Sequence, residues 1–397
     1  MPSIEQLDAI TQDDLVAAGA TRWARGGDVI GAFVAEMDFG VPAAVTERLH
    51  TEVERGAFGY LPARLATELR EATAAFLQRQ TGWAVDPSHI HEMPDVISIF
   101  QAVIGTFLRA DSKIIVPTPS YMPFLEVPPL MGREVIEVEM LRDDSGRHRY
   151  DLAALEAAFD AGGELLVLCN PHNPTGRVFT REEMEPLIDL VDRRGGRVFS
   201  DEIWMPLVLE GRHLPYASLS EAAAGHTITA VSASKAFNLP GLKCAQLITS
   251  NEADRDHFTA VGHFARHGAA NLGLAATSAA YSEAEDWLED IVTYLRRNRD
   301  TLTELVRTLL PRARLSSMEG TYVAWLDLGA YGITGSLHDH LLEHARVECT
   351  DGTDCGAAGA GHVRLIYAMP QPLLIEAITR IARALEPEQS GDEFVIT

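Results

Sequence analysis

The chain has 397 residues, of which 46% are hydrophobic and 23% charged, and such a chain can bury a large core that usually divides into two domains. Its 33 basic and 57 acidic residues give a formal net charge of -24, which argues against a nucleic-acid partner or an anionic membrane surface. The four cysteines are too few for a disulfide framework, so we expect a reducing compartment.

The N-terminal stretch MPSIEQLDAITQDDLVAAG is acidic, whereas a signal peptide needs a basic start and an apolar core. No run in the chain approaches the roughly 18 uncharged apolar residues of a membrane-spanning helix. We therefore expect an unprocessed cytoplasmic protein with no membrane partner.

From about residue 41 to 285, short β-rich runs alternate with longer amphipathic segments. This rhythm is typical of parallel strands joined by crossover helices, and it predicts an α/β sheet. Several of the runs are almost wholly apolar, so helices should cover both faces of the sheet. The strands that we expect lie at 113–116, 134–138, 165–169, 197–200, 227–231 and 246–249.

A long helix is predicted after Trp287, ending at Pro311, with the run LRRNRD (295–300) facing outward. Its apolar side would hold Ile291, Leu295, Leu302, Leu305 and Leu309. Strands are expected at 322–328 and 363–367, before a closing helix with one apolar face made by Leu374, Ile378, Ile381 and Leu385. A smaller α/β domain therefore follows the larger one.

Several familiar ligand motifs are missing. The stretch GAAGAG at 356–361 precedes a strand, whereas a dinucleotide fingerprint follows one, so we interpret it as a loop. The chain has no phosphate-binding G-x-x-x-x-G-K-[ST] and no zinc-binding H-E-x-x-H. His89 and His91 are expected to form a surface pair rather than a metal site.

Lys235 stands in the segment SASK (232–235), which matches the S-x-x-K signature of serine acyl-enzymes. The companion motifs S-D-N and K-T-G are absent, so this match is weak. Alternatively, Lys235 is a buried amine whose depressed pKa makes it a Schiff-base nucleophile. The flanking runs TAVSAS and AFNLPG favour burial over an ordinary solvated lysine.

Polar side chains follow two of the predicted strands. NPHNPTG (170–176) comes directly after LLVLC, at the carboxyl edge where open α/β sheets bind ligands. It is either a rigid turn alone or a turn whose Asn170 and Asn173 side chains donate hydrogen bonds. The next strand ends in Ser200, Asp201 and Glu202, which places acidic groups at the same edge, unless they are merely solvated.

An amide, a carboxylate and an amine thus follow three apolar strands. The motifs NPHNPTG, SDEIW (200–204), SASKAFNLPGLK (232–243) and VRLIYAMP (363–370) together resemble pyridoxal-phosphate enzymes of fold type I, the class I/II aminotransferase-like group with the aspartate-aminotransferase fold. VAEMDF (34–39), FGYLP (58–62), PTPSYMPF (117–124) and KAFNLPGLKCA (235–245) resemble the MalY/PatB-like cystathionine β-lyase branch, which mostly cleaves carbon–sulfur bonds.

The resemblance implies three parts of the chain. Residues 41–285 would form a large cofactor-binding domain with a mostly parallel sheet between helices. Residues 286–397 would form a smaller α/β domain. Residues 1–40 would be an N-terminal segment that joins the small domain and lines the active-site entrance.

The resemblance also assigns the residues that would meet the cofactor and the substrate. Lys235 would hold pyridoxal 5'-phosphate through a Schiff base and take the α-proton of the substrate. Asp201 would pair with the pyridine nitrogen, Asn173 would hydrogen-bond the ring O3' and face the substrate, and Tyr121 would stack on the ring. Arg364 would grip the substrate carboxylate, unless it forms a structural salt bridge.

The cofactor phosphate would lie at a helix N-terminus. Val96 and Ile97 start this helix, Ser232 would give a hydroxyl, and Lys243 stands where many relatives have arginine. Tyr60 would reach in from a partner subunit, which implies a homodimer with shared active sites.

Two residues depart from the pattern of the relatives. Asp95 stands where many of them have glycine, and its charge would repel a phosphate unless it caps its own helix. Trp204 replaces the histidine common in the lyases and the tyrosine common in the aminotransferases. An indole near O3' packs or shapes the site, but it is no acid or base near neutral pH.

The function implied by the resemblance is β-elimination from a cysteine S-conjugate such as cystathionine, which yields a thiol, pyruvate and ammonia. An aminotransferase is the first alternative, because the same carbanion can instead be protonated on the cofactor. A specialised enzyme of secondary metabolism, acting on a bulky thiol conjugate or oxidatively, is the second. A non-catalytic regulator with this fold is the third, although the sequence has no DNA-binding module.

Overall fold

The structure is a computed structural model of the chain, and it describes residues 3–386. Its largest sheet has the strand order β2-β10-β9-β8-β7-β3-β4, in which β10 runs antiparallel to both neighbours and the other pairs are parallel. In that order the strands are β2 (Ile90–Met93), β10 (Ala245–Thr249), β9 (Thr227–Val231), β8 (Arg197–Asp201), β7 (Gly163–Cys169), β3 (Lys113–Thr118) and β4 (Val135–Glu139). All six predicted strands are confirmed, and the sheet is mostly parallel as expected.

Strand β2 was not predicted, because two of its four residues are polar. His91 and Glu92 are nonetheless 3% and 2% exposed, and Glu92 forms ion pairs with Arg70 and Arg266. The prediction of a surface pair is therefore wrong for His91, whose ring packs edge-on against Phe258. Burial lowers the pKa of His91 to about 4.

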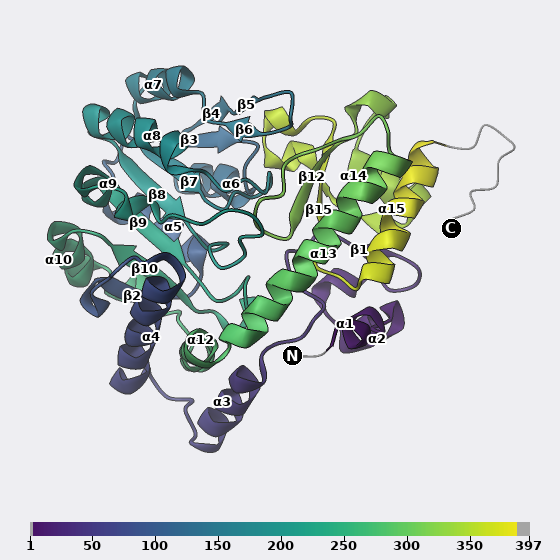
Figure 1. Cartoon of the computed structure of the whole chain (residues 1–397). Helices are drawn as coiled ribbons and strands as arrows, with labels where there is room; N and C mark the ends of the chain where they lie inside the picture. The colour runs from purple at the N-terminus through teal and green to yellow at the C-terminus, as the bar shows by residue number, and fades with distance from the viewer. Residues whose placement is uncertain (1–2, 387–397) are drawn as a thin grey trace, which may run out of the picture.

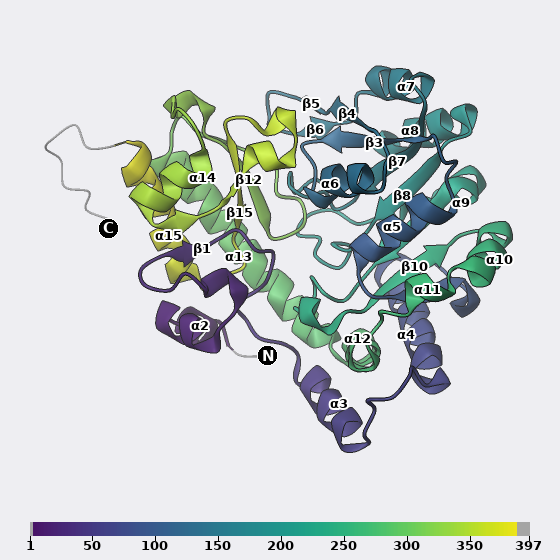
Figure 2. The same ribbon diagram turned by 180° about the vertical axis from the view of Figure 1, so that it is seen from behind.

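Alternate residues of the central strands point to opposite faces of the sheet, and helices cover both faces (Figures 1 and 2). Ile114 and Val116 of β3 pack in one core with α5 (Val96–Thr106) and α6 (Pro123–Leu130). Ile115, between them, packs in a second core. That core is completed by α7 (Leu152–Asp160), α8 (Arg181–Arg194) and α9 (Glu221–His226).

Helix α13 (Glu285–Leu309) is the predicted long helix, and it runs from the large sheet to the C-terminal part of the chain (Figure 1). Ile291, Leu295 and Leu302 are buried on its apolar side as expected, and Leu305 and Leu309 are partly buried. The prediction that LRRNRD faces outward is wrong for Leu295 and Asn298, because both residues are 0% exposed. The Asn298 amide donates to two backbone carbonyls, at 2.9 and 2.7 Å, so burial satisfies this polar side chain.

A four-stranded antiparallel sheet packs against α13 and α15 (Gln371–Leu385). Its order is β11 (Arg314–Leu315), β12 (Val323–Asp327), β15 (His362–Ile366) and β14 (Thr350–Asp351). Both predicted strands and the apolar face of α15 are confirmed. The GAAGAG stretch lies in the loop of short 3₁₀ turns that leads from β14 to β15.

The N-terminal segment lies against the C-terminal part of the chain. It contains α1 (Ile4–Asp8), α2 (Gln12–Ala18) and β1 (Ile30–Gly31), which pairs with β13 (Val347–Glu348). The Asp8 carboxylate pairs with Arg297 of α13 at 2.7 Å. This packing leads the backbone after β1 into the space between the two larger sheets.

The remaining helices and strands lie around this frame. Helix α12 (Asn271–Glu283) packs against α3 (Ala43–Glu54) and α4 (Ala63–Thr81), and α3 stands out from the body of the molecule (Figure 1). The others are α10 (Glu252–Val261), α11 (His263–Arg266), α14 (Leu337–His340), β5 (Leu141–Arg142) and β6 (His148–Arg149). Between residues 3 and 386, no helix combines the length and the apolar character needed to cross a membrane.

Candidate active site

A cavity of about 590 Å³ lies at the carboxyl ends of β7 and β8, where α/β sheets bind their ligands. Residues of both larger sheets, the first turn of α5 and the segment after β1 line it. The structure brings together nearly all the residues that the sequence analysis selected. These are Val96, Ile97, Tyr121, Asn173, Asp201, Trp204, Ser232, Lys235, Lys243 and Arg364.

Lys235 follows the end of β9 and is half-buried in the cavity wall. Its Nζ donates to the Ala35 carbonyl at 2.9 Å and lies 5.7 Å from the centre of the Trp204 ring. Burial, and then the positive charge of Arg364, lower the pKa of Lys235 to about 8. About a tenth of the amine is therefore neutral at pH 7, far more than for an ordinary lysine, as a nucleophile or a base requires.

The serine acyl-enzyme alternative does not fit this geometry. The Ser232 hydroxyl donates to the Cys244 carbonyl at 2.8 Å and accepts from the Ser234 amide at 3.1 Å. It is not hydrogen-bonded to Lys235, which would have to activate it as a base.

Asp201 ends β8 and is only 3% exposed. Its Oδ1 accepts from the Ile203 amide at 3.1 Å, and its Oδ2 faces the Cys169 thiol at 3.7 Å. It forms no ion pair with any residue between 3 and 386. Burial raises the pKa of Asp201 to about 7. A buried carboxylate of this kind calls for a positively charged N–H partner inside the cavity.

The two asparagines of NPHNPTG have different positions. Asn173 lines the cavity, and its Oδ1 accepts from Nη1 of Arg364 at 3.4 Å. Asn170 is 1% exposed; its Oδ1 accepts from the Phe179 amide and its Nδ2 faces the Met184 sulfur. The prediction of a ligand-facing donor is wrong for Asn170, whose side chain closes the turn instead.

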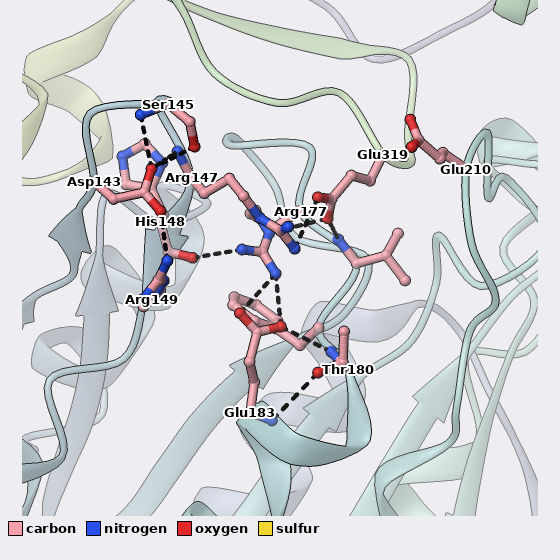
Figure 3. A network of polar contacts seen from close by, with 12 residues as sticks. Asp143, Ser145, Arg147, His148, Arg149, Arg177, Thr180, Glu183, Glu210 and Glu319 are labelled. Atoms are coloured by element: carbon pink, nitrogen blue, oxygen red, sulfur yellow. Dashed lines mark hydrogen bonds and ion pairs between the residues drawn. The ribbon is translucent and has the colours of Figure 1, made fainter.

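Arg177, directly after this turn, ties it to three other segments (Figure 3). Its fully buried guanidinium pairs with Glu183 of α8 at 2.7 Å and with Glu319, between β11 and β12, at 3.0 Å. It also donates to the His148 carbonyl of β6 at 3.0 Å. Gly176 has a φ of +73°, and a Cβ there would meet the Ser317 carbonyl oxygen at 3.1 Å. The turn that presents Asn173 is thus fixed from several sides.

Arg364 lies on β15, paired with Trp325 of β12 and Thr350 of β14. Its Nη2 donates to the Phe33 carbonyl at 2.9 Å and to the Thr350 hydroxyl at 3.2 Å, whereas its buried Nε has no acceptor. The residue is 3% exposed, and no carboxylate of residues 3–386 is within ion-pair distance. The alternative interpretation, that Arg364 forms a structural salt bridge, is therefore wrong. A buried cation with an unused N–H at a cavity wall is suited to bind an anion.

The N-terminus of α5 also faces the cavity, with Val96 and Ile97 in its first turn. Asp95 caps this helix as the sequence allowed, since its Oδ1 accepts from the Ser98 amide at 2.7 Å. Its Oδ2 pairs with Lys243 at 3.0 Å. The Ser232 hydroxyl, expected at the phosphate, donates here to the Cys244 carbonyl at 2.8 Å. Ser234, which we did not predict, also lines the cavity.

The aromatic residues flank the charged ones. Trp204 is 1% exposed and packs edge-on against Tyr322, with ring centres 4.7 Å apart, so it shapes the cavity wall. Tyr121 also lines the cavity, where it is partly buried and packs edge-on against Phe124. Tyr60 lies outside the cavity, on the α3–α4 loop, where it is 97% exposed.

The resemblance implies that residues 1–40 line the active-site entrance but selects no single residue of this segment; in the structure Phe33, Val34 and Ala35 line the cavity. It did not select four further lining residues, His338, Cys349, Thr350 and Asp354. These four lack any local signal, because α14, the small sheet and its loops bring them to the cavity. In residues 3–386, no group of three or more His, Cys, Asp or Glu side chains could hold a metal ion.

Comparisons with known proteins agree with this geometry. Residues 29–381 match the model of the family "Aminotransferase class I and II". A cystathionine beta-lyase of Corynebacterium glutamicum is 37% identical over 358 residues, which are 90% of this chain and 94% of that protein. The cystathionine beta-lyase PatB of Bacillus subtilis is 31% identical over 94% of this chain and 98% of its own. The crystal structure of the PLP-bound C-S lyase from Staphylococcus hominis has a TM-score of 0.88 and 26% identity, covering 96% of this chain and 99% of that one.

Proposed function

Since the chain belongs to the class I and II aminotransferase family, we propose that it is a pyridoxal-phosphate-dependent carbon–sulfur β-lyase. It cleaves cystathionine or another cysteine S-conjugate to a thiol, pyruvate and ammonia. One observation supports this assignment independently of the similarity to known proteins. The half-buried amine of Lys235, the buried carboxylate of Asp201 and the unpaired guanidinium of Arg364 all face one cavity.

The residues present fit the cofactor. The Asp201 carboxylate has no cationic partner in the described chain and suits the protonated pyridine nitrogen. Lys235 would bind the aldehyde carbon of the cofactor, and Asn173 would hydrogen-bond the ring O3'. Tyr121 and Trp204 would pack against the ring itself. The first turn of α5, Ser234 and Lys243 would hold the phosphate. When bound, pyridoxal phosphate supplies an electron sink for the electron pair left on the substrate Cα.

The side chains of the cavity then perform the elimination. Arg364 binds the substrate carboxylate and fixes Cα near Lys235, whose neutral amine removes the Cα proton. The electron pair of the broken Cα–H bond forms a Cα–Cβ double bond, and the sulfur leaves Cβ as a thiolate. Hydrolysis of the remaining three-carbon unit consumes one water and gives pyruvate and ammonia.

Tyr60 supports a homodimer with shared active sites, which we also propose. Tyr60 and Phe58 are 97% and 70% exposed, on a concave surface that Lys243 also lines. A partner subunit placed there would bring its own Tyr60 toward the phosphate end of the cavity. We further propose a cytoplasmic location, in line with four free, buried cysteines.

The three-part division of the chain is likewise a proposal. The large sheet lies between residues 90 and 249, and the four-stranded sheet between 314 and 366. The pairing of β1 with β13 supports an N-terminal segment that joins the smaller part.

Product analysis tests the proposed function. Purified holoenzyme is mixed with cystathionine and with other S-substituted cysteines, and free thiol and pyruvate are measured together. We expect equal amounts of both and loss of both in Lys235→Ala, whereas Lys113→Ala, a surface lysine paired with Glu134, keeps them. A keto acid that retains the sulfur, with the cofactor left in its aminated form, would identify an aminotransferase instead.

A further inference from the structure

The segment 33–35, which lines the cavity, supplies acceptors to two of the proposed functional groups. Nζ of Lys235 donates to the Ala35 carbonyl at 2.9 Å, and Nη2 of Arg364 donates to the Phe33 carbonyl, also at 2.9 Å. Lys235 follows β9 of the large sheet, whereas Arg364 lies on β15 of the small one. One short stretch of backbone therefore holds groups that two different sheets bring to the cavity.

Arg22 holds this segment from both sides. The segment belongs to no helix or strand, so no ladder of backbone hydrogen bonds fixes it. Nε of Arg22 donates to the Gly31 carbonyl at 2.6 Å, and Nη1 donates to the Glu36 carbonyl at 2.9 Å. Arg22 is 1% exposed and is not among the residues that line the cavity. It therefore acts on the cavity only through the backbone that it binds.

The Arg22 guanidinium also contacts the strand that carries Arg364. Its Nη1 and Nη2 donate to the carbonyls of Ala368 and Ile366, at 3.2 and 3.3 Å, at and just beyond the end of β15. Its ion-pair partner, the Asp38 carboxylate, lies at 3.6 Å. The planar fork of an arginine reaches several acceptors in fixed directions, which the ammonium of a lysine cannot do. Arg22 thus fixes the segment 33–35 relative to β15.

Gly31 allows the close approach of Arg22 to this segment. A Cβ atom at Gly31 would lie 1.9 Å from the Arg22 carbonyl oxygen and 3.0 Å from the Arg22 Cγ. Any larger residue would have to displace the Arg22 backbone. Gly31 therefore offers a second way to disturb the same contact, one that leaves the charge of Arg22 in place.

We propose that Arg22 is a positioning residue, which holds the segment 33–35 so that its carbonyls orient Arg364 and Lys235. The inference rests on the proposed function, in which Arg364 binds the substrate carboxylate and Lys235 removes the Cα proton. A guanidinium that is held in place before the substrate arrives loses less conformational freedom on binding, so its affinity for a carboxylate is higher. An amine held near its working position likewise transfers a proton faster.

One measurement of binding and one of turnover, both on the holoenzyme, test the inference. Calorimetry gives the dissociation constant of 3-(methylsulfanyl)propanoate, which has a carboxylate for Arg364 but no amino group to react with the cofactor. Thiol release from cystathionine gives kcat and KM. In Arg22→Met we expect the dissociation constant and KM to rise by about tenfold and kcat to fall, because the fixed geometry is lost. Arg22→Lys should recover little, because an ammonium reaches fewer of the carbonyls.

Gly31→Ala is the second variant, and we expect it to change the three quantities in the same directions. Arg297→Met is the matched control. Arg297 also ties the N-terminal segment to the C-terminal part of the chain, through its ion pair with Asp8, but its hydrogen bonds go to Asp8 and Gln371. Its replacement should lower the free energy of unfolding in urea and leave the analogue affinity, KM and kcat unchanged.

The inference is overturned if Arg22→Met and Gly31→Ala unfold more easily but bind the analogue and turn over cystathionine like the unchanged enzyme. Arg22 would then act on stability alone. Equal changes in Arg297→Met, or no binding of the analogue to the unchanged enzyme, would overturn it as well. Absence of thiol release by the unchanged enzyme would instead overturn the proposed function, and the order of the analogue affinities would still decide whether Arg22 positions Arg364.

Discussion

Nη1 of Arg364 lies 3.4 Å from Oδ1 of Asn173, although the two residues are 191 positions apart in the sequence. This contact joins strand β15 of the small sheet to the turn after β7 of the large one. It places the proposed carboxylate-binding group beside the proposed cofactor-binding amide. The site is therefore assembled from both sheets, and its integrity depends on how each side chain is held.

Replacing Arg364 by alanine should lower kcat/KM for a cysteine S-conjugate by about 100-fold or more, because a buried charge pair with the substrate is lost. Arg364→Lys should restore little, since an ammonium cannot form two parallel hydrogen bonds to a carboxylate. Steady-state thiol release measures the effect, and cofactor absorbance checks that the site remains loaded. Near-complete rescue by lysine would contradict the assigned role.

The Asp95–Lys243 ion pair should weaken cofactor binding. In the Asp95→Asn variant the new amide side chain would still cap α5, but it would no longer repel a phosphate or hold Lys243. We therefore expect Asp95→Asn to lower the cofactor dissociation constant by about fivefold, and Lys243→Ala to raise it. Titration of the cofactor into apoprotein, followed by absorbance, gives both values. Weaker binding in Asp95→Asn would show that Asp95 supports the phosphate site.

The raised pKa of Asp201 predicts a dependence of stability on pH in the apoprotein. Its folded pKa of about 7 lies above the unfolded value of 3.8, so between these values the folded state binds more protons and loses stability as pH rises. From about pH 5.5 to about pH 8 the loss due to Asp201 is about 2 kcal/mol. Urea unfolding of the Asp201→Asn variant and of the unchanged apoprotein, each at both pH values, isolates the loss of unfolding free energy that is due to Asp201. Parallel pH dependence in the two proteins would contradict the raised pKa.

Arg177 should matter for stability rather than for chemistry. Arg177→Met leaves the carboxylates of Glu183 and Glu319 without their buried partner, which should lower the free energy of unfolding by about 3–5 kcal/mol. Arg181→Ala is the control, because its ion pair with Glu185 is exposed and contributes about 0.5 kcal/mol at most. Chemical denaturation of both variants measures the difference, and equal effects would contradict a special role of the network in Figure 3.

The sequence could predict the parts of the fold whose hydrophobic pattern is local. The apolar run 165–169 and the helical periodicity of α13 each indicate their structure within a few residues. The sequence did not predict strand β2, because His91 and Glu92 are polar residues of a kind that usually lies on the surface. Only the tertiary structure supplies the two arginines that allow Glu92 to be buried.

In the candidate site, too, local sequence could predict some residues, whereas others are brought there only by the tertiary structure. Lys235, Asp201 and Arg364 belong to contiguous motifs, so the resemblance could select them. Local sequence could not distinguish Asn173 from Asn170, since both follow the same strand and only the fold turns one inward. Asp354 and His338 reach the cavity through long-range packing, which no short motif records.

The most direct test of the account uses the fact that the chain has only three lysines, Lys113, Lys235 and Lys243. Borohydride reduction of the holoenzyme converts a bond between lysine and pyridoxal phosphate into a stable amine, which peptide mass spectrometry locates. We predict that the pyridoxyl group is found on Lys235 alone, with Lys113 and Lys243 unmodified as internal controls. A label on either of those two lysines, or none in protein supplied with excess cofactor, would contradict the central claim.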